Sequence, residues 1–374
     1  MKKVLIAGLM VLMLIAVIQA DIQDLSGNGK KNLRSANNYF RQKVYEKAMP
    51  FYQQVIDENP NHVESLYNMS GIYYEEDMDY ETAYGFYNRT LTAIQMVYDE
   101  YAQILESDEK AAKKYKKKFI DKENLDEKKE MAKLLQSNAW KYIYKEGYDN
   151  YVAEDYEAAI ITLEKLQELA PDSVLTIKML GNTNLKLGNT EKTLTYFKQL
   201  VELEPEKEQN AQLIANQYFK LDQKDLAVQW YEKAASIAPE NPDNYYNMGI
   251  CYTNLEQPAE AMAMFSKTLE FEPSNVDAIY NAKIIAQQLQ DMENFLRFSS
   301  MEFDVTGYNI ENLQVFCYQL NSLQLYEAVL EYGEKWAELA PENSAPYQLM
   351  FLAADKLGNK DLKNKYQKKL QSLN

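Results

Sequence analysis

The sequence predicts an all-α protein in which pairs of helices repeat along the chain and stack into a solenoid. Three observations predict this class. Residues 244–273 read as two short amphipathic helices that are closed by a proline. Glycine (12) and proline (10) are scarce in a chain of 374 residues, which suits helices joined by short turns. Prolines also recur at one constant interval, which indicates an internal repeat; they are Pro171, Pro205, Pro239 and Pro273, and Pro341 lies two intervals further on.

Small and bulky residues follow the same period, at fixed distances before each proline or its equivalent. A first column of small residues falls in the first helix of the units and holds Ala36, Gly147, Gly181, Ala215, Gly249 and Cys317. A second column falls in the second helix and holds Ala48, Ala159, Thr193, Ala227, Ala261 and Val329. A third column, one helical turn later, holds the bulky Tyr52, Leu163, Phe197, Tyr231 and Phe265, with Gly333 as an exception. Small residues allow two helices to approach, the bulky residue fills the adjoining space, and stacked pairs bury what one pair cannot.

This spacing and residue set closely resembles the tetratricopeptide repeat family over most of residues 29–374. The resemblance implies a right-handed superhelical solenoid of about eight helix pairs, with the first helix of each pair lining a concave groove. The clear units are 29–62, 63–96, 140–173, 174–207, 208–241 and 242–275. We expect N-terminal repeats in 21–96, a charged helical extension in 97–139 and four regular repeats in 140–275. Degenerate repeats and a polar C-terminal capping helix are expected in 276–374.

The extension interrupts the period, because the distance from Pro60 to Pro171 exceeds three whole periods. Apolar residues alternate three and four apart there, which is typical of a helix that packs along a seam; they are Leu91, Ile94, Tyr98, Tyr101, Leu105, Ala112, Tyr115 and Phe119. We expect two lengthened helices that form an antiparallel hairpin; the alternative is a degenerate extra repeat with an insertion. Seven lysines from Lys110 to Lys122 would lie at its tip, either contacting an anionic surface or forming a solvated helix face.

Residues 1–20 have the order of a secretory signal peptide. Basic residues in MKK precede an apolar run from Val4 to Ile18, and Gln19 and Ala20 precede the proposed cleavage before Asp21. No cysteine for lipid attachment lies near this junction. We therefore expect an exported protein, periplasmic or secreted; an uncleaved segment would be its only membrane contact.

Composition argues against several functional classes. The formal net charge of −16 opposes binding to nucleic acid. His62 is the single histidine, and the two cysteines, Cys251 and Cys317, fall at packing positions far along the chain. We expect no catalytic residue, metal site or cofactor, since one histidine and two distant cysteines supply neither a familiar zinc site nor a nucleophile with its base. Metal-assisted or paired-carboxylate hydrolysis would be the least implausible enzymatic class.

The resemblance implies that a partner binds along the first helices. The predicted binding residues are Asn68, Tyr74, Tyr144, Lys145, Tyr148, Tyr151, Lys178, Asn182, Lys186, Asn216, Lys220, Tyr246, Asn247, Tyr280 and Asn281. Asparagine amides can pair with an extended peptide backbone, and tyrosine rings offer rigid contact area. Lys178 and Asn182 are similar to the first half of a carboxylate clamp, but Leu213 stands where the next clamp asparagine would be. The alternative is that these polar residues only keep the concave surface hydrated and bind no partner.

We therefore expect a non-catalytic scaffold or adaptor that binds a peptide segment or helix of a partner protein. Export suggests a secretion or assembly factor in the bacterial cell envelope. One alternative is a carbohydrate- or peptidoglycan-associated binding module, in which tyrosines stack on sugar rings. Another is a structural homo-oligomer in which the apolar stripe of residues 91–119 pairs with a second copy.

Overall fold

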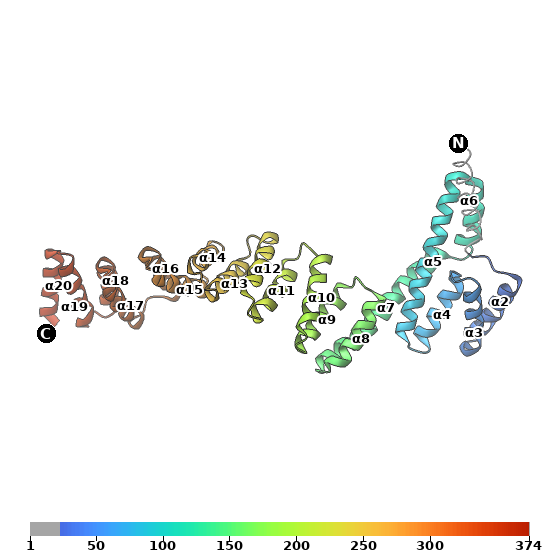
Figure 1. Ribbon diagram of the computed structural model, residues 1–374, viewed down its shortest axis with the longest axis horizontal. Helices are drawn as coiled ribbons and strands as arrows, with labels where there is room; N and C mark the ends of the chain where they lie inside the picture. The colour runs from blue at the N-terminus through green and yellow to red at the C-terminus, as the bar shows by residue number, and fades with distance from the viewer. Residues whose placement is uncertain (1–22, 374) are drawn as a thin grey trace. The chain divides into compact units, whose positions relative to one another are not determined.

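A computed structural model describes residues 23–373, and these residues form helices joined by short turns, with no strand among them (Figure 1). The predicted all-α solenoid class is confirmed. The chain divides into two compact units, Met1–Pro205 (unit 1) and Glu206–Asn374 (unit 2). The predicted signal segment, residues 1–20, lies outside the described residues.

The described part of unit 1, residues 23–205, contains four packed helix pairs: α2 with α3, α4 with α5, α7 with α8, and α9 with α10. A short helix, α6, and a π-helix, η1, lie between α5 and α7 in the sequence. The bounds are α2 Gly27–Arg41, α3 Tyr45–Glu58, α4 Val63–Glu75, α5 Tyr80–Ser107, α6 Glu109–Tyr115, η1 Lys116–Asp121, α7 Leu125–Val152, α8 Tyr156–Leu169, α9 Val174–Lys186 and α10 Thr190–Leu203.

Unit 2 contains five packed pairs, from α11 with α12 to α19 with α20. The bounds are α11 Glu208–Lys220, α12 Lys224–Ile237, α13 Pro242–Asn254, α14 Pro258–Phe271, α15 Val276–Gln288, α16 Met292–Thr306, α17 Ile310–Ser322, α18 Tyr326–Leu339, α19 Ser344–Lys356 and α20 Lys360–Leu373. The last pair is one more than predicted, because residues after 343 form two helices instead of a single capping helix. Leu349, Met350 and Ala353 are buried and anchor the additional helix α19.

The columns of small and bulky residues meet where the two helices of a pair cross. A Cβ atom added to Gly181 would lie 2.5 Å from Cε1 of Phe197, and one added to Gly249 would lie 2.7 Å from Cε1 of Phe265. These contacts are closer than any side chain tolerates, so the ring of the second helix occupies the space that glycine leaves. The packing rule predicted from the period therefore holds at these two crossings.

A further column with the same period marks the turn inside each pair from α7 onward. One residue there has a left-handed backbone, with φ between 57° and 74°; the column is Glu154, Gly188, Asp222, Glu256, Gln290, Gln324 and Gly358. Side chains other than glycine adopt this conformation at a cost, so sequence patterns alone did not reveal it. The column continues unbroken through 276–343, which shows that the degenerate repeats keep the regular turn.

The pair α15–α16 keeps its packing by exchanging the sizes of two residues. Ala261 and Phe265 of the preceding pair correspond to Phe295 and Ser299 here, and both of the latter are fully buried. The bulky side chain thus moves one helical turn along the second helix, so the total volume is nearly conserved. Lys283 stands in the first-helix column that is small in most other pairs.

The predicted helical hairpin insertion is present, but its second arm differs from the expectation. Beyond the middle of α5, α6 and η1 return along the helix, and the Tyr115 hydroxyl donates to Oε2 of Glu100 at 2.6 Å. Helix α7 begins only beside the middle of α5, where the Tyr98 hydroxyl donates to Asp126. The lysine-rich segment therefore runs down the returning arm, and the tip itself is formed by residues 107–109.

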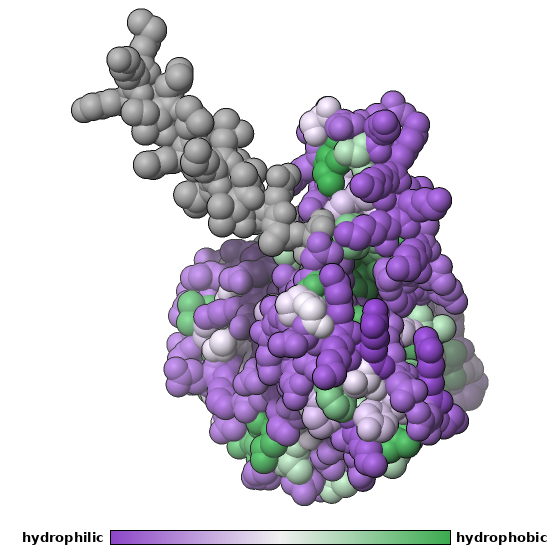
Figure 2. All heavy atoms as spheres, turned by 90° about the vertical axis from the view of Figure 1, so that its right-hand side faces the viewer, coloured by the Kyte–Doolittle hydropathy of each residue, from purple (hydrophilic) through white to green (hydrophobic). Residues whose placement is uncertain are grey.

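The apolar stripe of residues 91–119 packs within this hairpin and against α4. Ile94, Ala112, Tyr115 and Phe119 are all buried. The face shown in Figure 2 is mainly hydrophilic, and its hydrophobic residues form small separate patches. The stripe that would have paired with a second copy is therefore largely covered by the chain itself.

Candidate functional site

The predicted binding residues lie on the first helices of the pairs, but they are divided between the two units. Lys178, Asn182 and Lys186 are on α9 of unit 1, whereas Asn216 and Lys220 are on α11 of unit 2. These five predicted residues therefore belong to two different units. We describe the residues of each unit separately.

Asn68 is part of a chain of hydrogen bonds that joins the first two helix pairs. Its Nδ2 donates to the Tyr52 hydroxyl at 2.8 Å, and that hydroxyl donates to Oδ1 of Asn37 at 2.8 Å. Nδ2 of Asn37 donates to Oε1 of Glu64 at 3.0 Å. Within residues 23–373, Oδ1 of Asn68 accepts no hydrogen bond, so this network fixes the amide and leaves its carbonyl oxygen available.

The residue in the bulky column also decides whether an asparagine at the repeat position of Asn37 has a hydrogen-bond partner. Asn216 occupies the repeat position of Asn37, and it accepts a hydrogen bond from the Tyr231 hydroxyl in the bulky column. Asn182 also occupies this position, but the bulky residue of its pair is Phe197, which has no hydroxyl. Asn182 accordingly makes no side-chain hydrogen bond with any described residue.

Two further asparagines were predicted in unit 2, and they differ from each other. Nδ2 of Asn281 donates to the backbone oxygen of Asp277 at 2.9 Å and lies 3.5 Å from the Tyr246 hydroxyl. Asn247, on α13 with Tyr246, makes no side-chain hydrogen bond within the described part of the chain. The shorter of these two contacts lies within α15 itself, so Asn281 bonds mainly to its own helix and only weakly to α13.

Tyr74 belongs to an aromatic cluster that joins α4, α5 and α7. Its ring centroid lies 5.4 Å from that of Tyr80, 6.3 Å from Tyr87 and 6.4 Å from Tyr142, all in edge-to-face arrangements. Tyr80 and Tyr142 stack on each other at 4.4 Å. Such pairs stabilise helix packing, so Tyr74 has a structural role beside any contact with a partner.

Tyr246 packs against Phe265 with 5.7 Å between the ring centroids, and the other four predicted tyrosines fall into two groups. Tyr144 stacks on Trp140 with 4.9 Å between the ring centroids, and Tyr151 packs edge-on against Tyr156, the first residue of α8. Tyr148 and Tyr280 are 46% and 52% exposed. Nζ of Lys283 lies 5.4 Å from the ring centroid of Tyr280, so Tyr148 is the member of the second group whose ring makes no such contact with a described residue.

The predicted lysines are all exposed. Lys145 forms an ion pair with Asp149 one helical turn away. Lys178, Lys186 and Lys220 form no ion pair with a described residue. Exposed charges of this kind contribute little to stability and are free to contact a partner.

A hollow of about 210 Å³ opens beside Asn68, and we call it the Asn68 hollow. It is lined by Phe40, Tyr45, Tyr67, Asn68, Gly71, Ile72, Glu75, Glu76, Tyr87 and Leu135, which come from α2, α3, α4, α5 and α7 and from the residue that follows α4. Gly71 lines the hollow, and a Cβ atom added there would meet no heavy atom within 4 Å, so there is space for a larger side chain at this position. The hollow is smaller than the sites of drug-sized ligands, which begin at about 300 Å³, and it suits a single side chain.

The Asn68 hollow is acidic at one end. Glu75 and Glu76 lie at the C-terminal end of α4, where no basic residue occupies the last turn, and both are exposed. Neither forms an ion pair with a described residue. Burial raises the pKa of Tyr67, and the Glu127 and Glu75 carboxylates raise it further. These observations describe a hollow with aromatic walls and uncompensated negative charge.

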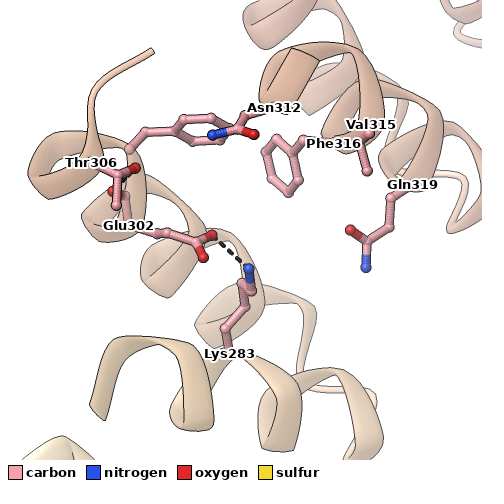
Figure 3. A pocket seen from close by; sticks show the side chains of 8 residues that line it. Lys283, Glu302, Thr306, Asn312, Val315, Phe316 and Gln319 are labelled. Carbon is pink, nitrogen blue, oxygen red and sulfur yellow. Dashed lines mark hydrogen bonds and ion pairs between the residues drawn. The ribbon is translucent and has the colours of Figure 1, made fainter. Parts of the chain in front are cut away.

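A second hollow, of about 270 Å³, lies in unit 2 between α15, α16 and α17, and we call it the Lys283 hollow (Figure 3). Nζ of Lys283 forms an ion pair with Oε2 of Glu302 at 2.5 Å on one side. The Phe316 ring and the amides of Asn312 and Gln319 face the space from α17. Its main charged groups are already paired, so this hollow offers mixed polar and apolar contacts without strong selection by charge.

The single histidine has a structural position. Nδ1 of His62 accepts a hydrogen bond from the Ser65 backbone N–H at 3.3 Å and so caps the start of α4. Burial, and to a smaller extent the positive charge of Lys128, lower the pKa of His62 to about 4. A buried cap with this pKa is protonated only in acid.

The two thiols are also buried at packing positions. Burial raises the pKa of Cys251 to about 11 and that of Cys317 to about 12. Between residues 23 and 373, no three side chains of His, Cys, Asp or Glu are grouped so as to hold a metal ion. In the same range, no helix is both long and apolar enough to cross a bilayer.

Of the fifteen predicted binding residues, only Asn68 lines the Asn68 hollow, and neither hollow was predicted. Asn68 was predicted, whereas Gly71 inside a helical pattern and Glu75 beside it were not considered. In unit 2, the presence of Lys283 in a column of mostly small residues could have indicated the Lys283 hollow. Both hollows depend on three or more helices, which the repeat columns do not relate to one another.

Two family models match parts of the chain. A tetratricopeptide repeat model matches residues 32–62, and a model of subunit 3 of the anaphase-promoting complex (cyclosome) matches residues 187–268. Together with the consecutive helix pairs, the matches support a tetratricopeptide repeat protein. The comparison with curated proteins gave no match.

Several solved structures resemble about half of this chain. A crystal structure of MamA protein is 18% identical with a TM-score of 0.40, covering 44% of this chain and 91% of that one. MamA from residue 41 onward of Desulfovibrio magneticus RS-1 is 17% identical with a TM-score of 0.38, covering 45% and 97%. YrrB, described as a TPR protein with an unusual peptide-binding site, is 18% identical with a TM-score of 0.37, covering 46% and 89%. At these identities the likeness concerns the fold alone.

Proposed function

We propose that this chain is a non-catalytic scaffold that binds a peptide segment of a partner protein across α2, α4 and α7. The Asn68 hollow is the observation that carries the proposal. It combines room for one side chain, aromatic walls and an oriented amide oxygen that accepts no hydrogen bond from the described residues. Aromatic rings supply contact area at a low cost in side-chain entropy, and an open amide can pair with a peptide.

The environments of the histidine and the thiols support a non-catalytic role. A general base or a nucleophile must reach a substrate and have a pKa near the working pH. His62 is only 6% exposed and its pKa is lowered to about 4, whereas burial raises the pKa of Cys251 to about 11 and that of Cys317 to about 12. None of these three groups suits proton transfer or nucleophilic attack at neutral pH.

The carbohydrate alternative has weaker support. It relies on tyrosine faces open to a sugar ring, and Tyr148 and Tyr280 are the most exposed of the predicted tyrosines. Neither lines the Asn68 hollow or the Lys283 hollow. We therefore favour a peptide as the ligand class.

The proposed location is the bacterial cell envelope or the surrounding medium, where the chain would serve secretion or assembly. The proposal relies on the order of basic, apolar and small residues in positions 1–20. N-terminal sequencing of the protein from its native host is expected to give Asp21 as the first residue. A chain that starts at Met1 in the cytosolic fraction would contradict export.

Peptide binding can be tested by selecting a displayed library of random dodecapeptides on the purified protein. Gly71→Leu is expected to fill the Asn68 hollow and to abolish most of the enrichment. Gly85→Leu is the matched control, since Gly85 also lies inside a helix with no heavy atom near an added Cβ, but outside the hollow. A selection that enriches no peptide, or the same peptides on both variants, would overturn the proposal.

A further inference from the structure

On the basis of the proposed peptide binding, we propose that the Asn68 hollow receives the charged side chain of a lysine or arginine in a basic segment of the partner. The hollow brings together aromatic rings, an open amide oxygen and the carboxylates of Glu75 and Glu76. This combination recognises a cation with an apolar stem.

The end of α4 is the first reason. Backbone carbonyls at a helix C-terminus carry partial negative charge, and cations stabilise such ends while carboxylates do not. Here Glu75 is the last residue of the helix and Glu76 is its C-cap, and no basic residue lies in the last turn. A bound ammonium or guanidinium group would supply the positive charge that this end lacks.

The aromatic walls are the second reason. Phe40, Tyr45 and Tyr67 line the hollow together, and cations are attracted to the faces of such rings. The methylene stem of lysine or arginine packs on aromatic surface while its head stays near polar groups. A purely apolar side chain would use the walls but leave the carboxylates without a partner.

Hydrogen-bonding capacity is the third reason. Ammonium and guanidinium groups are donors only, and they need acceptors. Oδ1 of Asn68 accepts no hydrogen bond from the described residues, because the amide donates through Nδ2 to Tyr52. With the two carboxylates, the hollow offers acceptors at one end, whereas an acidic ligand would be repelled there.

The charge of the whole chain favours the same class of partner. The formal net charge is −16, so a basic segment is attracted over a distance before it reaches the hollow. The Lys283 hollow lacks this selectivity, since its lysine is already paired with Glu302. The inference therefore applies to the Asn68 hollow and not to every hollow of the solenoid.

The experiment begins with the peptides that the random dodecapeptide library yields on the wild-type protein. We expect enrichment of one lysine or arginine position, lost in Gly71→Leu and retained in Gly85→Leu. The best peptide is then synthesised with that residue as lysine, as arginine and as norleucine, which keeps the stem without the charge. Isothermal titration calorimetry is expected to show similar affinity for the first two and roughly tenfold weaker binding of the norleucine peptide.

The role of the two carboxylates is tested with the double variant Glu75→Gln and Glu76→Gln. This variant should bind the lysine peptide about five- to tenfold more weakly than the wild type. The matched control is the double variant Glu106→Gln and Glu168→Gln. These two glutamates are also exposed, lie near helix C-termini and form no ion pair with a described residue. The control has the same net charge, so a non-specific attraction would weaken binding equally in both double variants.

The outcomes separate this inference from the proposed function. Peptides that depend on Gly71 but carry no basic residue, or that bind equally well with norleucine, would overturn the inference and leave peptide binding intact. Equal weakening by the two double variants would also overturn it. If no peptide is enriched at all, the proposed function fails and this inference fails with it.

Discussion

Acidification should destabilise this protein through its single histidine. His62 is buried, and its Nδ1 accepts the hydrogen bond from the Ser65 N–H that caps α4. Protonation of Nδ1 removes this acceptor and places a charge in a buried site beside the positive Lys128, opposed by Glu58. The folded state therefore resists a proton that the unfolded chain accepts readily.

The magnitude follows from the two pKa values. Burial, with the charge of Lys128, lowers the pKa of His62 in the fold from 6.5 to about 4. Between these values the unfolded state binds more protons, so the free energy of unfolding falls as the pH falls. The loss is negligible at pH 7.5, about 2 kcal/mol at pH 5 and about 3 kcal/mol below pH 4.

The substitution His62→Asn isolates this contribution. Asparagine is a preferred N-cap that can still accept from the Ser65 N–H, but it does not titrate. Urea titrations followed by circular dichroism at pH 7.5 and pH 5.0 give the free energy of unfolding of both proteins. We expect the wild type to lose about 2 kcal/mol more than His62→Asn, because the carboxylates titrate in both. Equal losses in the two proteins would refute the reasoning.

Two further predictions concern packing positions. Gly249→Ala should destabilise the fold by about 1 to 3 kcal/mol, since the added Cβ atom would lie 2.7 Å from the Phe265 ring. Gly85→Ala should stabilise the fold by roughly 0.5 to 1 kcal/mol, because alanine has a higher helix propensity and nothing lies within 4 Å of the added Cβ atom. Thermal unfolding checks both, and a neutral Gly249→Ala would contradict the close approach. Cys251 and Cys317 should not react with iodoacetamide at pH 8 in the native protein and should both react in guanidinium chloride, because burial raises both thiol pKa values. Mass spectrometry measures the labelling, and rapid modification of the folded protein would show that these thiols are accessible.

Part of the candidate site could be predicted from the sequence. The helical period placed Asn68 on a first helix, and the structure brings its amide to the edge of a hollow. The period could not show that Gly71 lines this hollow or that Leu135, which is distant from Asn68 in the sequence, closes one side. Those relations depend on where α7 begins beside α5, which no local pattern determines. Whether the remaining predicted residues bind a partner stays a prediction.

The class, the period and the pairing of Gly249 with Phe265 follow from the sequence alone, because they rest on residue size at intervals within one repeat. Where a helix pair departs from the repeat pattern, tertiary packing determines which substitutions preserve the fold. Phe295 and Ser299 exchange sizes across one helical turn, and Gln290 keeps the left-handed turn without glycine. Packing against neighbouring pairs stabilises such exceptions, because stacked helices require that the total volume of the buried side chains be conserved and do not require a particular residue at each position. The acidic aromatic hollow arises in the same way, from helices whose contacts are set by packing and not by the period.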